Sequence, residues 1–215
     1  MPSPGVSLPA PPLSPSREEF RRLAQDGNLV PVYTELPADL DTPLGAFLRL
    51  RPGPYAFLLE SVEGGEKWAR YSFLGSDPLM VITSRGNRTT LRSSDGKTER
   101  LTRGNPLQAL REVMARFHPV PVPGLPRFHG GAVGVMAYDM VRHFERLPRT
   151  SKDDLGFPDA VFLLTDTLLA FDNLRHRLLV IANCHLESTD PASLDSAYDA
   201  AAVKIGMMLA RLGRP

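Results

Sequence analysis

The stretch AVFLLTDTLLAFDNLRHRLLVIA, residues 160–182, carries the strongest fold signal in the chain. Two apolar runs, Ala160 to Phe171 and Leu178 to Ala182, are joined by the polar residues 172–177. Apolar runs rich in branched and aromatic side chains and separated by a short polar link are typical of paired strands. The stretch therefore predicts an antiparallel hairpin.

Strand patterns also occupy the region upstream of this hairpin. The run from Tyr55 to Ser61 is almost entirely apolar, and the segments 71–74 and 79–83 are rich in aromatic and branched residues. Residues 89–101 fold back through Ser94-Asp95-Gly96-Lys97, which is a strong hairpin turn. These patterns predict strands joined mainly by hairpins.

Four helix starts surround the strands. A capping box at Ser16 to Glu19 predicts a helix from Arg17 to near Gly27. Three further helices are predicted to begin at a capping residue followed by proline, at Thr42-Pro43, Asn105-Pro106 and Asp190-Pro191. The last of these helices carries an apolar stripe of Leu194, Tyr198, Ala201, Ile205, Met208 and Leu212. Hairpin-linked strands with helices before, between and after them predict an α+β fold of antiparallel β-sheets with flanking helices. The proline-rich residues 119–126 are interpreted as a rigid loop that separates two strand-rich halves of one domain.

Composition narrows the function classes. The chain has 215 residues, 42% of them hydrophobic, and its 25 Lys and Arg balance 24 Asp and Glu, so no bulk charge favours nucleic acid or an anionic membrane. The only cysteine, Cys184, excludes an internal disulfide and is interpreted as a buried thiol. Residues 1–16 contain six prolines and are expected to be a disordered leader to a domain at 17–215. No segment is apolar enough to span a membrane, and we expect a cytoplasmic protein.

Three polar residues follow or precede strand patterns closely enough to form a ligand site. Glu60 and Ser61 end the apolar run, and Arg70 precedes the next one. A carboxylate accepts hydrogen bonds from an ammonium group, and a guanidinium fork matches a carboxylate, so the three groups could hold an amino acid by its two charged ends. The simpler alternatives are a strand that emerges into solvent, for Glu60 and Ser61, and a surface ion pair, for Arg70.

Other chemistry-bearing residues are better explained structurally. Gly64-Gly65 lies between strands, and Gly130-Gly131 with Gly134 lacks the lysine and helix of a phosphate loop, so a turn and a closely packed strand are expected. The five histidines show no metal-binding i, i+4 pair. Asp139 and Asp153-Asp154 are interpreted as capping or loop residues. No metal or cofactor is therefore expected in this chain.

The amino-acid sequence of residues 55–75 resembles the effector-site region of the large subunit, component I, of anthranilate synthase. Further matching motifs follow in the order found in that family, from about Leu29 to about Asn183: Leu29 to Tyr33, Leu40 to Phe47, Gly130 to Gly134, Tyr138-Asp139, Phe144-Glu145, Asp153 to Asp159, and Asp166 to Asp172. In the family the Gly130 segment is a core strand, usually with an aromatic residue where this chain has Val135 and Met136.

The resemblance implies a regulatory role. It implies that Glu60, Ser61 and Arg70 contact the feedback inhibitor L-tryptophan, and that the parent enzyme converts chorismate to anthranilate in tryptophan biosynthesis. The resemblance also implies that chorismate, magnesium (Mg) and the acid-base residues belong to a C-terminal catalytic domain, which we expect to be absent from this chain. It further implies that ammonia is supplied by a glutamine amidotransferase subunit, component II. We therefore expect no activity from this chain alone. Two alternatives remain open: the N-terminal part of aminodeoxychorismate synthase component I, in the folate pathway, and a free-standing binding module.

Overall fold

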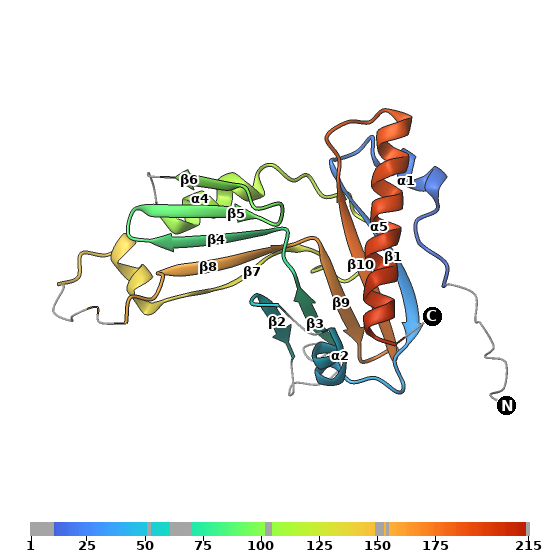
Figure 1. The fold of residues 1–215 in the computed structure, drawn as a ribbon, viewed down its shortest axis with the longest axis horizontal. Coiled ribbons are helices and arrows are strands. Elements are labelled where there is room, and N and C mark those ends of the chain that lie inside the picture. The colour runs from blue at the N-terminus through green and yellow to red at the C-terminus, as the bar shows by residue number, and fades with distance from the viewer. Residues whose placement is uncertain are drawn as a thin grey trace.

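Two antiparallel five-stranded sheets form the framework of the protein, and their strands run in clearly different directions (Figure 1). The computed structural model describes residues 11–50, 53–60, 70–101, 105–148, 153 and 155–213. The first sheet has the order β1 (Leu29–Pro37), β10 (Arg177–His185), β9 (Thr167–Asp172), β3 (Tyr71–Ser76), β2 (Ala56–Leu59). The second has the order β6 (Thr98–Leu101), β5 (Arg88–Ser93), β4 (Met80–Arg85), β8 (Ala160–Thr165), β7 (Gly131–Met136). The predicted α+β antiparallel fold is confirmed.

The apolar run at 160–171 is two strands in different sheets, which corrects its interpretation as one strand of a hairpin. The chain leaves the second sheet after Thr165 and enters the first at Thr167. Asp166, at the corner, has its carbonyl oxygen bonded by both the backbone N–H (2.7 Å) and the Nδ2 (3.1 Å) of Asn183. The hairpin itself is confirmed, because β9 pairs with β10 with Phe171 opposite Leu178.

A second connection between the sheets runs from β3 to β4. It turns at Asp77, which has a left-handed φ of 52°. Aspartate tolerates this conformation better than most residues because its short polar side chain can bond locally. The predicted hairpin at 89–101 is also confirmed, as β5 pairs with β6.

The four predicted helices begin where their caps predict. The helices within the described residues are α1 (Arg17–Leu23), α2 (Pro43–Leu50), α4 (Pro106–Met114), α5 (Pro191–Arg211) and the short 3₁₀ helix η1 (Tyr138–His143), for which no cap was predicted. The side chains of Ser16, Asn105 and Asp190 accept hydrogen bonds from backbone N–H groups in the first turns of α1, α4 and α5. Helix α1 ends at Leu23, earlier than the predicted end near Gly27.

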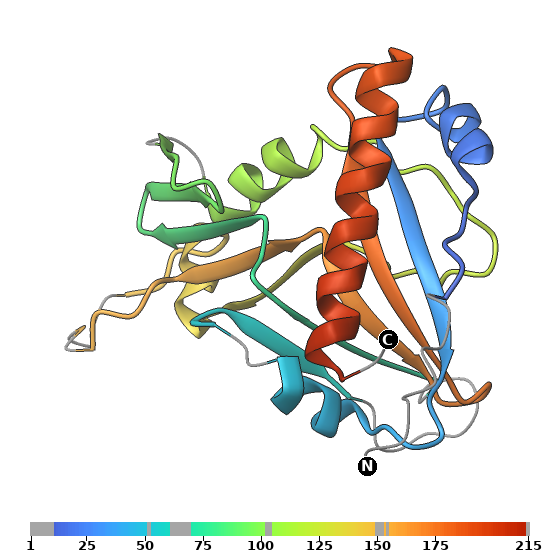
Figure 2. The same cartoon turned by 45° about the vertical axis from the view of Figure 1, so that its right-hand side comes forward.

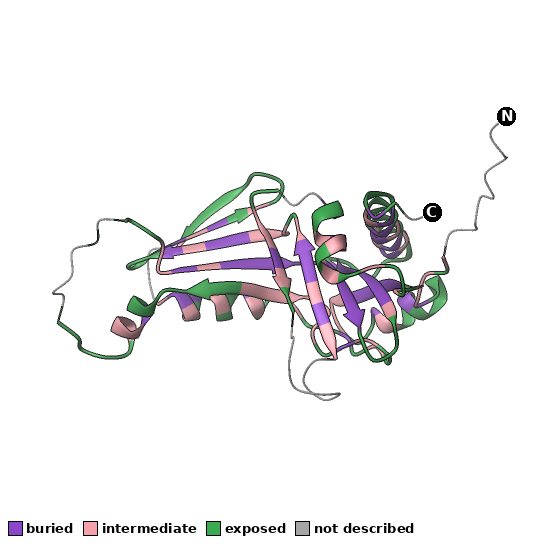
Figure 3. Cartoon of the chain, turned by 90° about the horizontal axis from the view of Figure 1, so that it is seen from below, coloured by how far each residue is buried: buried purple, intermediate pink, exposed green. Residues whose placement is uncertain are grey.

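On each sheet, a buried apolar cluster lies between one face of the sheet and a helix. Helix α5 lies along one face of the first sheet (Figure 2), where its Tyr198 and Ile205 join a buried cluster with Val180 of β10. Val113 of α4 joins a second cluster with Ile82 of the second sheet. Buried segments run along the central strands of the sheets and along β1, whereas the outer strands β6 and β7 of the second sheet are largely exposed or half-buried (Figure 3).

The last residues of the predicted leader contact β1 and α5. Ser14 exchanges two backbone hydrogen bonds with Tyr33 of β1, at 2.8 and 2.7 Å. The Tyr198 hydroxyl of α5 donates to the Pro15 carbonyl at 3.0 Å. Residues 1–10 lie outside the described part of the chain.

The structure corrects two further expectations from the sequence, one for the proline-rich loop and one for strand β7. The proline-rich loop at 119–126 does not divide the strands into halves, because each sheet contains strands from both sides of it. Strand β7 is closely packed at Gly134 but is an edge strand, with Val135 70% and Met136 54% exposed, so the expected core strand is incorrect. Among the described helices, none has the length and apolar character needed to cross a membrane.

Candidate functional site

Two of the three predicted ligand residues, Glu60 and Arg70, lie at one end of the β2–β3 strand pair. These strands are antiparallel, with Leu59 of β2 opposite Phe73 of β3. Glu60 directly follows β2 and Arg70 directly precedes β3, so both flank the segment 61–69. Ser61 belongs to that segment, which lies outside the described residues, and its predicted role is therefore not tested.

Glu60 is exposed, and no described residue forms a hydrogen bond or ion pair with it. Its neighbour Leu59 is also 45% exposed, so the strand emerges into solvent here, in line with the simpler alternative. An exposed carboxylate at this position is free to accept hydrogen bonds from an ammonium group. The geometry is compatible with both interpretations of Glu60.

Arg70 is held by a buried carboxylate. Its Nε donates to Asp172 Oδ1 at 3.0 Å, and its Nη2 donates to Asp172 Oδ2 at 2.8 Å. The Asp172 side chain has 0% exposure, whereas that of Arg70 keeps 29%. The guanidinium also lies over the ring of Tyr71, 4.8 Å from its centroid. Arg70 therefore forms an ion pair, as the simpler alternative expected, and this pair with Asp172 fixes the orientation of the guanidinium group.

Asp172 connects two arginines, Arg70 just before β3 and Arg177 of β10. Arg177 of β10 donates from Nε to Asp172 Oδ2 at 3.3 Å, and its Nη1 donates to both oxygens of Glu35 on β1, at 2.8 and 2.7 Å. Burial of Asp172 would by itself raise the pKa of its carboxyl group, but the hydrogen bonds from Arg70 and Arg177 outweigh burial and hold that pKa below its usual value. Asp172 is therefore ionised at neutral pH and anchors both cations.

This network limits what Arg70 can offer to a ligand. Two of its donors, Nε and Nη2, are directed at Asp172, and no described residue bonds to Nη1. A ligand carboxylate would therefore approach from the Nη1 side. Sequence reasoning did not identify Asp172 or Arg177 as part of the site. The available signal was the concentration of charged residues between the two apolar runs at 160–182.

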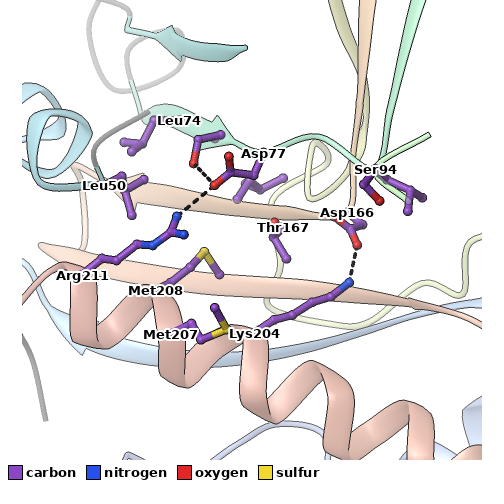
Figure 4. A pocket seen from close by; sticks show the side chains of 14 residues that line it. Leu50, Leu74, Asp77, Ser94, Asp166, Thr167, Lys204, Met207, Met208 and Arg211 are labelled. Atoms are coloured by element: carbon purple, nitrogen blue, oxygen red, sulfur yellow. Dashed lines mark hydrogen bonds and ion pairs between the residues drawn. The ribbon is translucent and has the colours of Figure 1, made fainter. Parts of the chain in front are cut away.

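A separate pocket of about 220 Å³ lies between α5 and the two corners where the chain changes sheets (Figure 4). Two ion pairs line it, Lys204 with Asp166 and Arg211 with Asp77, the latter at 2.9 Å. Both cations come from α5 and both carboxylates from the corners, so the pairs tie the helix to the connections between the sheets. The rest of the lining includes Leu50, Leu74, Met207 and Met208.

Neither the cysteine nor a cluster of metal-ligating side chains forms a further site in the described part of the chain. Cys184 is buried, as predicted, and burial raises the pKa of its thiol to about 12, so it is not a thiolate nucleophile at neutral pH. Within the described ranges, no group of three or more His, Cys, Asp or Glu side chains could hold a metal ion.

Comparison with known proteins places these features in a family. Residues 36–210 match the model of the chorismate binding enzyme family. The chain is 42% identical over 185 residues to anthranilate synthase component 1 of Acetivibrio thermocellus, which covers 86% of this chain and 37% of that protein. It is 40% identical over 205 residues to the protein of the same name from Synechocystis, covering 94% and 40%.

A solved structure shows the same fold. The crystal structure of anthranilate synthase component I from Streptococcus pneumoniae TIGR4 matches with a TM-score of 0.52 and 24% sequence identity. The match covers 84% of this chain and 37% of that one. The chain thus spans about two fifths of the length of these two curated relatives, corresponding to their N-terminal part.

Proposed function

The chain belongs to the chorismate-binding enzyme family, and from this premise we propose that it is the tryptophan-binding regulatory part of an anthranilate synthase component I. The whole enzyme would convert chorismate to anthranilate in the cytoplasm, for tryptophan biosynthesis. Its magnesium would be held by the catalytic domain, and component II, a glutamine amidotransferase, would supply ammonia. The present chain would bind L-tryptophan as the feedback inhibitor.

The observation that supports this proposal is the position of Glu60 and Arg70 at the same end of the β2–β3 pair. An amino acid carries an ammonium and a carboxylate on one carbon atom, and the two protein groups have the complementary charges. Glu60 would accept hydrogen bonds from the ammonium, and the Nη1 group of Arg70 would donate to the carboxylate. The Ser61 hydroxyl would bond to the same head group.

Regulation would follow from a population shift. L-tryptophan would bind one arrangement of the enzyme better than another and draw the population toward it, a coupling typically of about 1 to 3 kcal/mol. Strand β3 is suited to transmit such a change. It pairs with β2 and β9 in the first sheet, and it continues through Asp77 into β4 of the second.

Calorimetric titration tests the proposal directly. L-tryptophan should bind the chain, whereas D-tryptophan and L-alanine should bind at least tenfold more weakly, because they alter the head-group geometry or lack the indole ring. Glu60→Gln should weaken L-tryptophan binding about tenfold to a hundredfold, since it removes a charge-assisted hydrogen bond.

Glu60 is suitable for this test because it has no described partner, so its replacement should leave the melting temperature unchanged. Lys97→Ala, in the β5–β6 turn, is the matched exposed control. Equal L-tryptophan affinity in wild type and Glu60→Gln would contradict the assignment of the site. Absence of binding, both to this chain and to the longest natural polypeptide that contains it, would contradict the function.

A further inference from the structure

A groove on the second sheet is lined by cations and hydroxyl groups. It has a volume of about 350 Å³, and strands β4, β5 and β6 supply its lining. Ile82 and Leu91 of β4 and β5 pack in the cluster that contains Val113 of α4. Because successive side chains of a strand point to opposite faces, Thr83 and Thr90 lie on the face away from α4.

The strand register places three arginines on this same face. Thr83 is opposite Thr90, and two residues further along the same pair of strands Arg85 is opposite Arg88. On the next strand Arg100 is opposite Thr90. Three adjacent strands therefore each contribute one guanidinium group. Directly opposed like charges destabilise a strand pair, so the Arg85 and Arg88 pair has an electrostatic cost that an anion would relieve.

The protein itself offsets only part of this charge. Arg85 forms an ion pair with Asp153 at 2.7 Å, but both side chains are more than half exposed, so solvent screens the pair. Arg88 and Arg100 are exposed, and neither side chain has a hydrogen bond or ion pair with any residue in the described ranges.

Carboxylates gather beside the groove, at the β4–β5 turn. Arg85 and Arg88 also line a neighbouring pocket that contains Asp139, Asp153 and Asp159. None of these carboxylates lines the groove itself, whose described lining has Thr, Arg and Leu side chains only. Of the three arginines that line the groove, Arg85 shares a donor with a carboxylate, that of Asp153, whereas no described carboxylate bonds to the side chains of Arg88 and Arg100.

We propose that this groove binds a small phosphate-bearing anion with at least two negative charges. Guanidinium groups match phosphate oxygens in pairs of hydrogen bonds, and the Thr83 and Thr90 hydroxyls can donate to further oxygens. Three cations in one groove favour a multivalent anion over a monovalent one. This site is separate from the proposed tryptophan site and goes beyond the proposed function.

The test is a titration of the chain with inorganic pyrophosphate, followed by calorimetry and by amide chemical shifts. Low ionic strength is required, because salt screens exposed charges. Saturable binding is expected, with the largest shifts in β4, β5 and β6. Arg88→Gln and Arg100→Gln should each weaken binding about tenfold, and the double variant should abolish it. Arg111→Gln, an exposed arginine on α4, is the matched control and should bind as wild type does.

Several results would overturn the proposal. These are an absence of saturable binding, an equal loss of affinity in the groove variants and in Arg111→Gln, and chemical shifts that NaCl of the same ionic strength reproduces. Citrate supplies a polycarboxylate arm, and tighter binding of citrate than of pyrophosphate would overturn the assignment to phosphate. Melting temperatures of all variants establish that they are folded. L-tryptophan binding should be unchanged in Arg88→Gln and Arg100→Gln, so this proposal and the proposed function can fail independently.

Discussion

Arg70 and Asp172, 102 positions apart in the sequence, form an ion pair with two hydrogen bonds in which the carboxylate has no solvent exposure. Strand pairing brings them together, because Tyr71 of β3 is opposite Asp172 of β9. Arg177 bonds to the same carboxylate from β10. The orientation of a candidate ligand residue at the β2–β3 end therefore depends on two strands that supply none of the proposed ligand contacts.

Asp172→Asn should destabilise the protein. The substitution removes the negative charge that pairs with two partly buried guanidinium groups. Breaking a buried ion pair lowers the free energy of unfolding by about 3 to 5 kcal/mol. Because Arg70 is partly exposed to solvent, we expect a loss of about 2 to 3 kcal/mol here. Urea denaturation measures the change in the free energy of unfolding. Asp95→Asn, in the exposed ion pair with Lys97, is the control and should unfold as wild type does. A loss below about 1 kcal/mol for Asp172→Asn would mean that the network is not a main source of stability.

The stabilisation from Asp172 should depend on pH in a definite direction. Its pKa is lower in the folded protein than in the unfolded chain, so its contribution is fully present above the unfolded value of about 3.9 and is lost as the pH falls through the folded value. The difference in unfolding free energy between wild type and Asp172→Asn should therefore be constant from about pH 7 to 5 and shrink below about pH 4. A difference that grows on acidification would contradict the depressed pKa.

Two glycine-to-alanine substitutions should have opposite effects. A Cβ atom on Gly134 would lie 2.1 Å from the carbonyl oxygen of Val161, so Gly134→Ala must displace β7 from β8 and should lower the melting temperature by several degrees. A Cβ atom on Gly206, within α5, would meet no atom within 4 Å apart from the adjoining backbone of its own helix and its chain neighbours. Gly206→Ala should therefore stabilise the helix by about 0.5 to 1 kcal/mol. Thermal unfolding of the two variants measures both changes. Equal melting temperatures would show that β7 can move at little cost.

Ser61→Phe should abolish L-tryptophan binding while leaving the fold intact. The change removes a hydroxyl that the proposal assigns to the head group and adds a bulky ring. Loss of a hydrogen bond to a charged group costs about 1.5 to 3 kcal/mol, which corresponds to roughly a tenfold to hundredfold loss of affinity before any steric clash. The measurement is a calorimetric titration beside Lys97→Ala. A wild-type midpoint in Ser61→Phe would place the effector site elsewhere.

The chain should self-associate through the open edge of β7. No described strand pairs with that edge, and the side chains of Val135 and Tyr138 nearby are 70% and 89% exposed. Exposed apolar strand edges tend to pair with other chains. Sedimentation velocity should show association that increases with concentration, and Val135→Lys should reduce it. A wild-type monomer at high concentration would contradict this expectation.

The sequence by itself determined the features that depend on neighbouring residues. The caps at Ser16, Asn105 and Asp190 start helices because each side chain bonds a backbone N–H in the first turn, whatever the rest of the fold does. The β5–β6 and β9–β10 hairpins likewise follow from short polar links between strand-forming segments. The order of motifs was also sufficient to identify the family.

Only the tertiary structure decided where the apolar run at 160–171 divides and what holds Arg70. An apolar run has the same pattern whether it forms one strand or two, and here the corner at Asp166 is bonded by Asn183 of another strand. The Arg70 and Asp172 pair has the same origin, because sheet register joins residues that no local pattern links. Such contacts depend on the free energy of the whole packed sheet, which local sequence signals do not contain.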